Sequence, residues 1–448
     1  MFRAIGRALA PALAAVVCLG AAGKPAVSFT DNKLKNGLRV IISEDHTAPT
    51  VTVAVTYNVG SADERTGRTG FAHLFEHMMF KGSENVGPGE HPALIFNNGG
   101  TMNGTTNADR TLYFETLPAN QLELALFLEG DRMKSLDINK ANLDNQRNAV
   151  QEERRLRVDN QPYGQTFERT SNQAYDNPAY KHSVIGSMED LNAATVDDVA
   201  TFFKTYYAPN NAIVSIVGDL ETRKTMSLVE KYFGGIARQP SPKRPELSEP
   251  RHTRERRSTI EDPLARLARV DIVWIGPPAG SPDSDALDVL SDVLSGGRSS
   301  RLNQVIVREK QLATNAAAFP DESRGPGLFQ ALATVAPGKN PADVEQAVYD
   351  EIEKVKSGPI ADWEIEKARN SARRNAANAV TSTLQRAIQL GQYALFYDDP
   401  NRINTISDRI EKVTAADVQR AASKYLTEEN RSVIITTPKA AAPKGGQQ

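Results

Sequence analysis

A short apolar segment, "GFAHLFEHMMFKG" at residues 70–82, contains two of the chain's six histidines and one glutamate. On a helix, His73 and His77 lie one turn apart on the same side, and Glu76 lies between them on nearly that side. Two imidazoles at this spacing can hold one zinc ion, and the carboxylate can take a proton from a zinc-bound water and pass it to a leaving amine. The spacing therefore predicts metal-assisted hydrolysis of a peptide bond.

A catalytic zinc ion also needs a third protein ligand and an open position for water. The segment "NQRNAVQEERRLR" at residues 145–157 reads as a helix and carries Glu152 and Glu153 at adjacent positions. Either glutamate could supply the third ligand, and the residue pattern alone leaves the choice open. The alternative, in which the histidines are ordinary helix residues, is disfavoured because a His-x-x-Glu-His run is rare in a chain with so few histidines.

Strands and helices are mixed around these candidate ligands. The segments "LRVIISE" and "TVTVAVTYNVGS", which begin at residues 38 and 50, alternate apolar and polar residues and predict half-buried strands. The segment "ANQLELALFLEGDRMKSL", which begins at residue 119, repeats leucine at helical spacing. We therefore expect an α+β protein.

The length of 448 residues is comfortable for two domains. Residues 236–262 are dense in proline and charge, which is typical of an exposed connection between domains. This predicts an N-terminal domain at 28–235 with the zinc residues, a linker at 236–262 and a C-terminal domain at 263–440. Residues 441–448 are expected to form a disordered tail.

The two halves end in similar sequences, "TVDDVATFFKTYYAPNNAIVSIVGD" from Thr195 and "TAADVQRAASKYLTEENRSVIITTP" from Thr414. Matching residues are 219 positions apart, namely Thr195 and Thr414, Asp198 and Asp417, Val199 and Val418, Tyr206 and Tyr425, and Asn211 and Asn430. The constant offset indicates a duplication, and the alternative is two unrelated copies of a common helix-turn-strand pattern. In the second copy the zinc positions fall near Leu287, Leu290 and Ser291, which cannot bind metal, so that half is predicted to shape the enclosure.

The N-terminus has the pattern of a secretory signal peptide at residues 1–23: two arginines precede the apolar run "ALAPALAAVVCLGAAG". Its removal takes away Cys18, the only cysteine, which excludes disulfides, zinc-thiolate sites and a cysteine nucleophile. We expect a periplasmic or secreted protein without a stable membrane anchor. The net charge of −2 gives no support for a nucleic-acid partner.

The run His73-Leu-Phe-Glu-His77 is the inverted zinc motif of the inverzincins, and nearly the whole chain resembles the M16 zinc peptidases, of the short bacterial M16B type. The resemblance also covers residues 98–118, 145–164, 206–219 and 296–313. It implies two similar domains, each a mostly antiparallel sheet with helices on one side, which together form half of a clamshell. Family spacing selects Glu153 over Glu152 as the third ligand. Many relatives have a supporting glutamate where this chain has Gln146.

The resemblance further implies that an extended peptide adds to a sheet edge beside the zinc, where Asn103 would contact its backbone. The alternative for Asn103, which precedes Gly104, is a turn residue. Single-chain relatives use an arginine and a tyrosine from the C-terminal half; this chain has Arg308, but Asn315 stands where the tyrosine belongs. We therefore expect a heterodimer with a related chain that lacks the zinc motif, or else a homodimer.

The resulting prediction is an exported zinc-dependent endopeptidase for extended or unfolded peptides, with Glu76 as the general base that activates a zinc-bound water. The main alternative is a non-catalytic peptide-binding or scaffold subunit of an M16-like complex. A zinc hydrolase for non-peptide substrates is less favoured, because "GGRSSR" lacks the lysine and spacing of a phosphate-binding loop.

Overall fold

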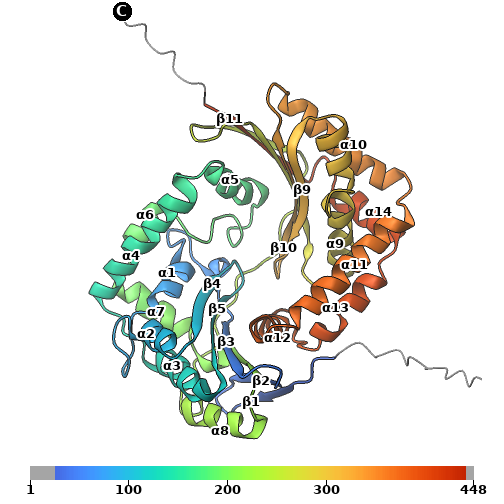
Figure 1. Ribbon diagram of the computed structural model, residues 1–448. Helices are drawn as coiled ribbons and strands as arrows, with labels where there is room; N and C mark the ends of the chain where they lie inside the picture. Colours follow the sequence, from blue (N-terminus) through green and yellow to red (C-terminus); the bar gives the residue numbers. More distant parts are fainter. Residues whose placement is uncertain (1–25, 440–448) are drawn as a thin grey trace, which may run out of the picture.

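The computed structural model describes residues 26–439. The predicted signal peptide at 1–23, with Cys18, and the predicted tail at 441–448 lie outside the described residues. The chain forms two halves that face each other, the N-terminal one in blue to green and the C-terminal one in yellow to red (Figure 1). Within the described ranges, no helix combines the length and apolar character needed to cross a membrane.

The N-terminal half is built on a six-stranded sheet in the order β1-β2-β6-β3-β5-β4, in which only β2 and β6 run parallel. Its strands are β1 (Thr30–Lys33), β2 (Arg39–Glu44), β3 (Thr50–Tyr57), β4 (Thr101–Thr106), β5 (Thr111–Pro118) and β6 (Ala212–Gly218). Its helices are α1 (Phe71–Met78), α2 (Glu90–Asn97), α3 (Leu122–Ser135), α4 (Lys140–Arg154), α5 (Gly164–Ala174), α6 (Met188–Ala193), α7 (Val196–Tyr206) and α8 (Thr222–Phe233). A π-helical turn, η3 (Arg155–Asp159), continues α4.

The C-terminal half repeats this plan with five strands in the order β7-β11-β8-β10-β9, in which only β7 and β11 run parallel. Its strands are β7 (Arg256–Asp262), β8 (Arg269–Pro278), β9 (Ala313–Asp321), β10 (Pro326–Val335) and β11 (Arg431–Pro438). Its helices are α9 (Pro282–Ser295), α10 (Pro341–Ser357), α11 (Asp362–Ala379), α12 (Thr383–Tyr397), α13 (Arg402–Glu411) and α14 (Ala415–Tyr425), with a π-helical turn η5 (Asn303–Glu309) before β9. The predicted α+β class with two similar halves is confirmed.

The similar sequences that begin at Thr195 and Thr414 also form the same local structure. Thr195 and Thr414 each begin a helix with a capping box, in which the threonine side chain accepts from the backbone of the aspartate three residues on. The Asn211 amide donates to the carbonyl of Tyr206, and the Asn430 amide donates to that of Tyr425, both at 2.7 Å. The same residues therefore make the same turn in both halves, as the duplication predicts.

Each half also covers the second face of the other half's sheet. Helix α12 packs against β3 and β6 through Leu390 and Ala394, while α5 lies beside β11, where the Thr166 and Thr436 hydroxyls are 2.7 Å apart (Figure 1). The prediction that the strand at residue 50 is half-buried is therefore wrong. Its polar residue Thr52 is fully buried and bonds the hydroxyls of Thr116 and Thr383 at 2.8 and 3.0 Å, which satisfies the hydroxyl group away from water.

The predicted linker is not a free connection. Its last seven residues form β7, which pairs with β11 in the C-terminal sheet, whereas residues 237–255 contain neither helix nor strand. The Arg244 guanidinium in this stretch donates to the carbonyl of Asn58 at 2.7 Å, and the Asn177 amide donates to the carbonyl of Glu246 at 2.9 Å. The connection is therefore held along the N-terminal half, and the domain boundaries themselves stay a prediction.

Candidate metal centre

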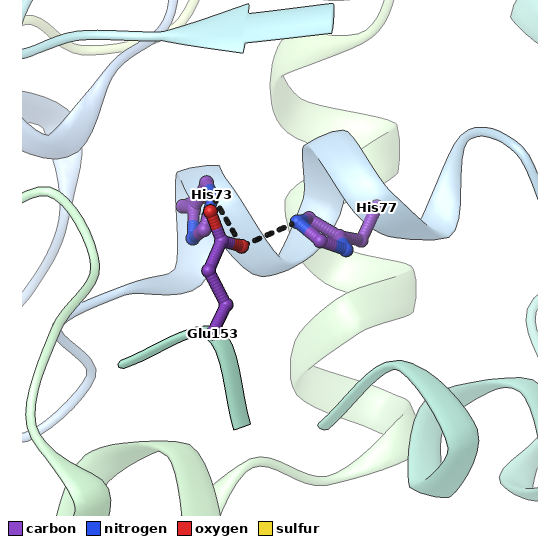
Figure 2. A group of neighbouring side chains, drawn as sticks. All are labelled: His73, His77 and Glu153. Carbon is purple, nitrogen blue, oxygen red and sulfur yellow. Dashed lines mark ion pairs between the residues drawn. The ribbon is translucent and has the colours of Figure 1, made fainter. Parts of the chain in front are cut away.

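The helix α1 separates an apolar face from a polar one. Its apolar side chains are buried in the core of the N-terminal half, namely Phe71, Leu74, Phe75 and Met78. The ring centroids of Phe75 and Tyr207 are 4.2 Å apart. His73 and His77 project from the other face at the predicted one-turn spacing (Figure 2). Burial of the apolar face fixes the rotation of the helix about its axis, and this rotation in turn directs both imidazoles to one point.

The start of α1 is held by a buried acid that the sequence pattern did not indicate. The Glu64 carboxylate accepts from the backbone N–H groups of Gly70 and Ala72 at 2.9 and 2.7 Å, which satisfies donors that a helix start leaves unpaired. Gly70 has a φ of +86°, and a Cβ there would lie 2.6 Å from the carbonyl oxygen of Ile185. Only glycine fits this position without a shift of the backbone.

The third candidate ligand comes from α4, which begins at the cap residue Asn139, whose side chain accepts from the backbone of Asn142 at 2.8 Å. The structure brings Glu153 to the histidines, whereas Glu152 is exposed and pairs with Arg155 at 2.9 Å. The π-helical turn η3 begins two residues after Glu153, and such turns in a helix are frequent at functional sites.

The three side chains converge on a single carboxylate oxygen (Figure 2). Oε2 of Glu153 lies 3.5 Å from Nε2 of His73 and 3.2 Å from Nε2 of His77. All three candidate ligand atoms lie within 4.8 Å of one another. Ligand atoms about 2.1 Å from a tetrahedral zinc ion stand roughly 3.4 Å apart, so these separations suit zinc.

The protonation of His73 and Glu153 also suits a metal. Burial, together with the neighbouring His77, lowers the pKa of His73 to about 4, which leaves its imidazole neutral with a lone pair to donate. Hydrogen bonding to His77 lowers the pKa of Glu153, against the opposing effect of burial, and keeps this carboxyl group ionised. A neutral imidazole and a carboxylate are the forms that bind zinc.

Glu76 lies beside this group and is buried against the edge strand β4. Its Oε2 accepts from the hydroxyl of Thr106 at 2.6 Å, and burial raises the pKa of its carboxyl group. Gly104, two residues earlier on the same face of β4, makes room for the glutamate, because a Cβ there would lie 2.9 Å from Cγ of Glu76. Thr106 was missed by the sequence analysis, since a threonine in a strand has no distinctive spacing from a helix residue thirty positions earlier.

Two sequence patterns of one peptidase family match the chain. The pattern described as "Insulinase (Peptidase family M16)" matches residues 39–187, and that described as "Peptidase M16 inactive domain" matches residues 193–372. The chain belongs to the M16 peptidase family. The candidate metal ligands lie in the first match, and the second match runs from just before α7 of the N-terminal half into α11 of the C-terminal half.

Relatives of this M16 chain include proteins named as zinc proteases. The chain is 29% identical to the zinc protease PqqE of Helicobacter pylori over 90% of its own length and 92% of that protein. It is 25% identical to a probable mitochondrial-processing peptidase subunit beta of Arabidopsis thaliana over 90% and 77% of the two chains. Zinc is therefore the metal of this family's named proteases.

Solved structures show the same fold. A protease from Helicobacter pylori superposes with a TM-score of 0.87 at 28% identity, over 92% of this chain and all of that one. The periplasmic protease PqqL from Escherichia coli superposes with a TM-score of 0.77 at 17% identity, over 93% of this chain but 49% of that one. The fold of this M16 chain thus corresponds to about half of that longer molecule.

The structure places the other candidate residues of this M16 chain at varying distances from the centre. Gln146 is buried on α4, and its amide donates to Asn145 at 2.5 Å rather than to a candidate ligand. Asn103 is exposed on β4, which pairs only with β5 among the described strands, and its side chain accepts from the next backbone N–H. Arg308 on η5 and Asn315 on β9 are exposed in the C-terminal half. The strand β9 lies across the molecule from α1 (Figure 1).

Proposed function

We propose that this protein is a zinc-dependent endopeptidase in which His73, His77 and Glu153 hold the metal. The proposal depends on one observation: the two imidazoles and the Glu153 carboxylate converge on a single point. A second carboxylate, that of Glu76, lies beside them. Zinc bound there supplies Lewis-acid chemistry, which polarises a carbonyl group and makes water more acidic.

Glu76 is the general base of the proposed reaction. Its carboxylate takes the proton of the attacking water and passes it to the amine that leaves, as the family resemblance implies. The hydroxyl of Thr106 engages Oε2, which leaves Oε1 for the proton. Burial of Glu76 between α1 and β4 holds the carboxylate in one orientation and limits its exposure to other water.

The edge strand β4 supplies the proposed substrate site. Among the described strands β4 pairs only with β5, so an extended peptide can add to its other side beside the metal ligands, with Asn103 in contact with the peptide backbone. Gln146 lies buried on the same helix as Glu153, but its amide bonds Asn145, so it is given no direct contact with that ligand.

Replacement of Glu76 by glutamine tests the proposal most directly. We expect Glu76→Gln to keep stoichiometric zinc and to lower hydrolysis of unstructured peptides by about 10²–10⁴-fold, because a general base contributes this much. Glu152→Gln is the matched control: this exposed neighbour of a proposed ligand should leave both zinc content and hydrolysis unchanged. Unchanged hydrolysis in Glu76→Gln would contradict the role of Glu76 as general base, whereas unchanged cellular function of this variant would favour a peptide-binding scaffold.

The chain is further proposed to act as one half of a two-chain clamshell. A related chain without the zinc motif would supply the tyrosine that is absent at Asn315 and complete the pair begun by Arg308; a second copy of this chain is the next choice. The match to about half of the PqqL chain supports this assembly. Light scattering of the purified chain and sequencing of copurifying proteins test it, and a fully active monomer would contradict it.

Export to the periplasm, or secretion, follows from the leader pattern at residues 1–23 and is proposed together with the enzymatic function. Relatives of the same fold include a protein named as periplasmic. Mass spectrometry of the mature protein should show a chain that begins shortly after residue 22 or 23. An intact residue 1, or a lipid on Cys18, would contradict this.

A further inference from the structure

A second group of metal-binding side chains lies far from α1 in sequence, where the connecting segment crosses the end of α5. It consists of Asp176, just after α5, and Glu249 and His252 in the segment before β7, and their candidate ligand atoms lie within 4.8 Å of one another. The connecting segment is proline-rich and lacks helix or strand here, so side-chain contacts must hold it in place.

His252 is the unusual member of this group. Its side chain is only 2% exposed, yet neither ring nitrogen has a hydrogen-bond partner among the described residues. Burial, assisted by the nearby Arg256, lowers the pKa of His252, so the buried ring is neutral. An unpartnered buried polar group destabilises the folded state, which points to a ligand that the protein atoms do not supply.

The Glu249 carboxylate is held in position beside this ring. Its two oxygens accept from the backbone N–H groups of Asp176 and Asn177 at 2.7 and 3.0 Å, and its side chain is 1% exposed. Oε1 of Glu249 lies 3.4 Å from Nε2 of His252, close to the spacing of two ligands of one zinc ion. Each carboxylate oxygen has two lone pairs, so Glu249 can bind a cation without losing these hydrogen bonds.

Asp176 gives the group an opening to solvent. Its side chain is 47% exposed, and its Oδ2 accepts from Arg256 at 2.5 Å, which leaves Oδ1 unused. Its carboxylate and that of Glu249 offer two anionic oxygen donors to a cation, although the Arg256 guanidinium already pairs with Asp176 and the Lys181 ammonium acts on it.

A comparable group in the N-terminal core, His91, Glu115 and Glu129, differs in the features that matter. Every member is buried, and Arg132 already forms an ion pair with Glu129. Burial raises the pKa of Glu115 to about 8, so the Glu115 carboxyl is mostly protonated at neutral pH. Arg132 balances the charge of Glu129. That group has no opening, and its His91 ring bonds Glu115 at 3.1 Å, whereas the Asp176 group has an opening and an unpartnered imidazole.

The geometry points to a second, structural metal site in which Asp176, Glu249 and His252 bind a divalent transition-metal ion of the zinc class. One imidazole with two carboxylates favours such an ion over calcium or magnesium, which prefer oxygen ligands only. The ion would join the end of α5 to the connecting segment shortly before β7 begins. Because α5 packs on the sheet that contains β7, the site would fix how the two halves are joined.

The test counts zinc in chains that lack the candidate catalytic centre. We expect the purified full chain to retain two zinc ions after dialysis, as measured by mass spectrometry of the metal, and the double variant His73→Gln/His77→Gln to retain one. Adding His252→Gln to the double variant should remove the remaining ion. A double variant without zinc, or one whose zinc is unaffected by His252→Gln and thus adventitious, would overturn the proposal. A chain with one zinc that only His252→Gln removes would instead contradict the proposed catalytic centre.

A second pair of variants tests the site even if His252→Gln does not fold. In the double-variant background, Asp176→Asn removes a half-exposed ligand and should weaken zinc binding by on the order of tenfold or more. Arg256→Gln breaks the same ion pair without removing a ligand and should keep zinc binding and the rise in melting temperature that added zinc produces. An equal loss of zinc-dependent stabilisation in both variants would show that the ion pair alone matters and would overturn the site.

Discussion

The helices α1 and α9 occupy equivalent places in the two halves but have opposite roles. At the positions of the α1 motif, α9 has Leu287 and Leu290, which are buried in the core of the C-terminal half together with Ile365 and Ala368 of α11. In the N-terminal half the motif face of α1 meets α4 and β4 instead, and the two histidine side chains stay partly accessible. The same helix position can therefore present either candidate metal ligands or core residues. Which of these it presents depends on its own residues and on the helix that packs against it.

The largest expected effect is the loss of peptide hydrolysis when a candidate zinc ligand on α1 is removed. His77→Gln should lower peptide hydrolysis by about a thousandfold or more and reduce bound zinc, because loss of the metal removes several kcal/mol of transition-state stabilisation. Ser291→Ala, at the equivalent position of α9, should change neither quantity. Kinetic assays with parallel metal analysis check both variants, and an equal effect at Ser291 would refute the division of roles between the halves.

A smaller effect is expected from Thr106, which positions Glu76. Thr106→Val removes the hydroxyl that donates to the carboxylate and should lower kcat by about 10- to 100-fold with little change in KM, since a hydrogen bond to a charged group contributes about 1.5–3 kcal/mol. Thr106→Ser keeps the hydroxyl and should retain most of the activity. Equal losses in the two variants would show that Thr106 acts through packing alone.

An ion cluster of the C-terminal half has basic residues where the N-terminal half has threonines. Asp283 accepts from Arg420, Lys424 and Tyr425 of α14, whereas Thr201 and Thr205 stand at the two basic positions in α7. Although burial raises the pKa of Asp283, hydrogen bonds from these three donors lower it to about 2.

Because the pKa of Asp283 is lower in the folded state, its stabilisation is present above about pH 4 and is lost as the pH falls toward about 2. Asp283→Asn should therefore lower the free energy of unfolding by about 1–2 kcal/mol at pH 7 and by progressively less below pH 4. Urea denaturation across this pH range measures the effect. A deficit that does not depend on pH would show that shape, and not charge, matters at this position.

The smallest expected effect should be the same in both halves. Thr195→Ala and Thr414→Ala each remove a capping-box hydroxyl and should each lower the free energy of unfolding by about 1 kcal/mol. Chemical denaturation of the two variants measures this. Markedly unequal losses would mean that the caps, although alike in geometry, are not equivalent in energy.

Much of the candidate centre could be predicted from local spacing. The two histidines and Glu76 share one helical turn, and helical geometry alone puts them on one side. The choice of Glu153 over Glu152 came from the family resemblance, because two adjacent residues on a helix look equivalent until the rotation of α4 is known. Glu64 and Thr106 were not predicted. Both contact α1 from outside that helix, and no periodic pattern in the sequence relates their positions to it.

The sequence by itself determined the motif, the duplication and the mixed fold, because these depend on spacing along the chain and on helical or strand period. Only the tertiary structure decided that the strands β3, β6 and β8 are buried on both faces, because the covering helices α5 and α12 come from the opposite half. It also decided which glutamate meets the histidines and that the connecting segment lies against Asp176. Contacts between distant residues depend on how whole elements pack, and no local pattern specifies that packing.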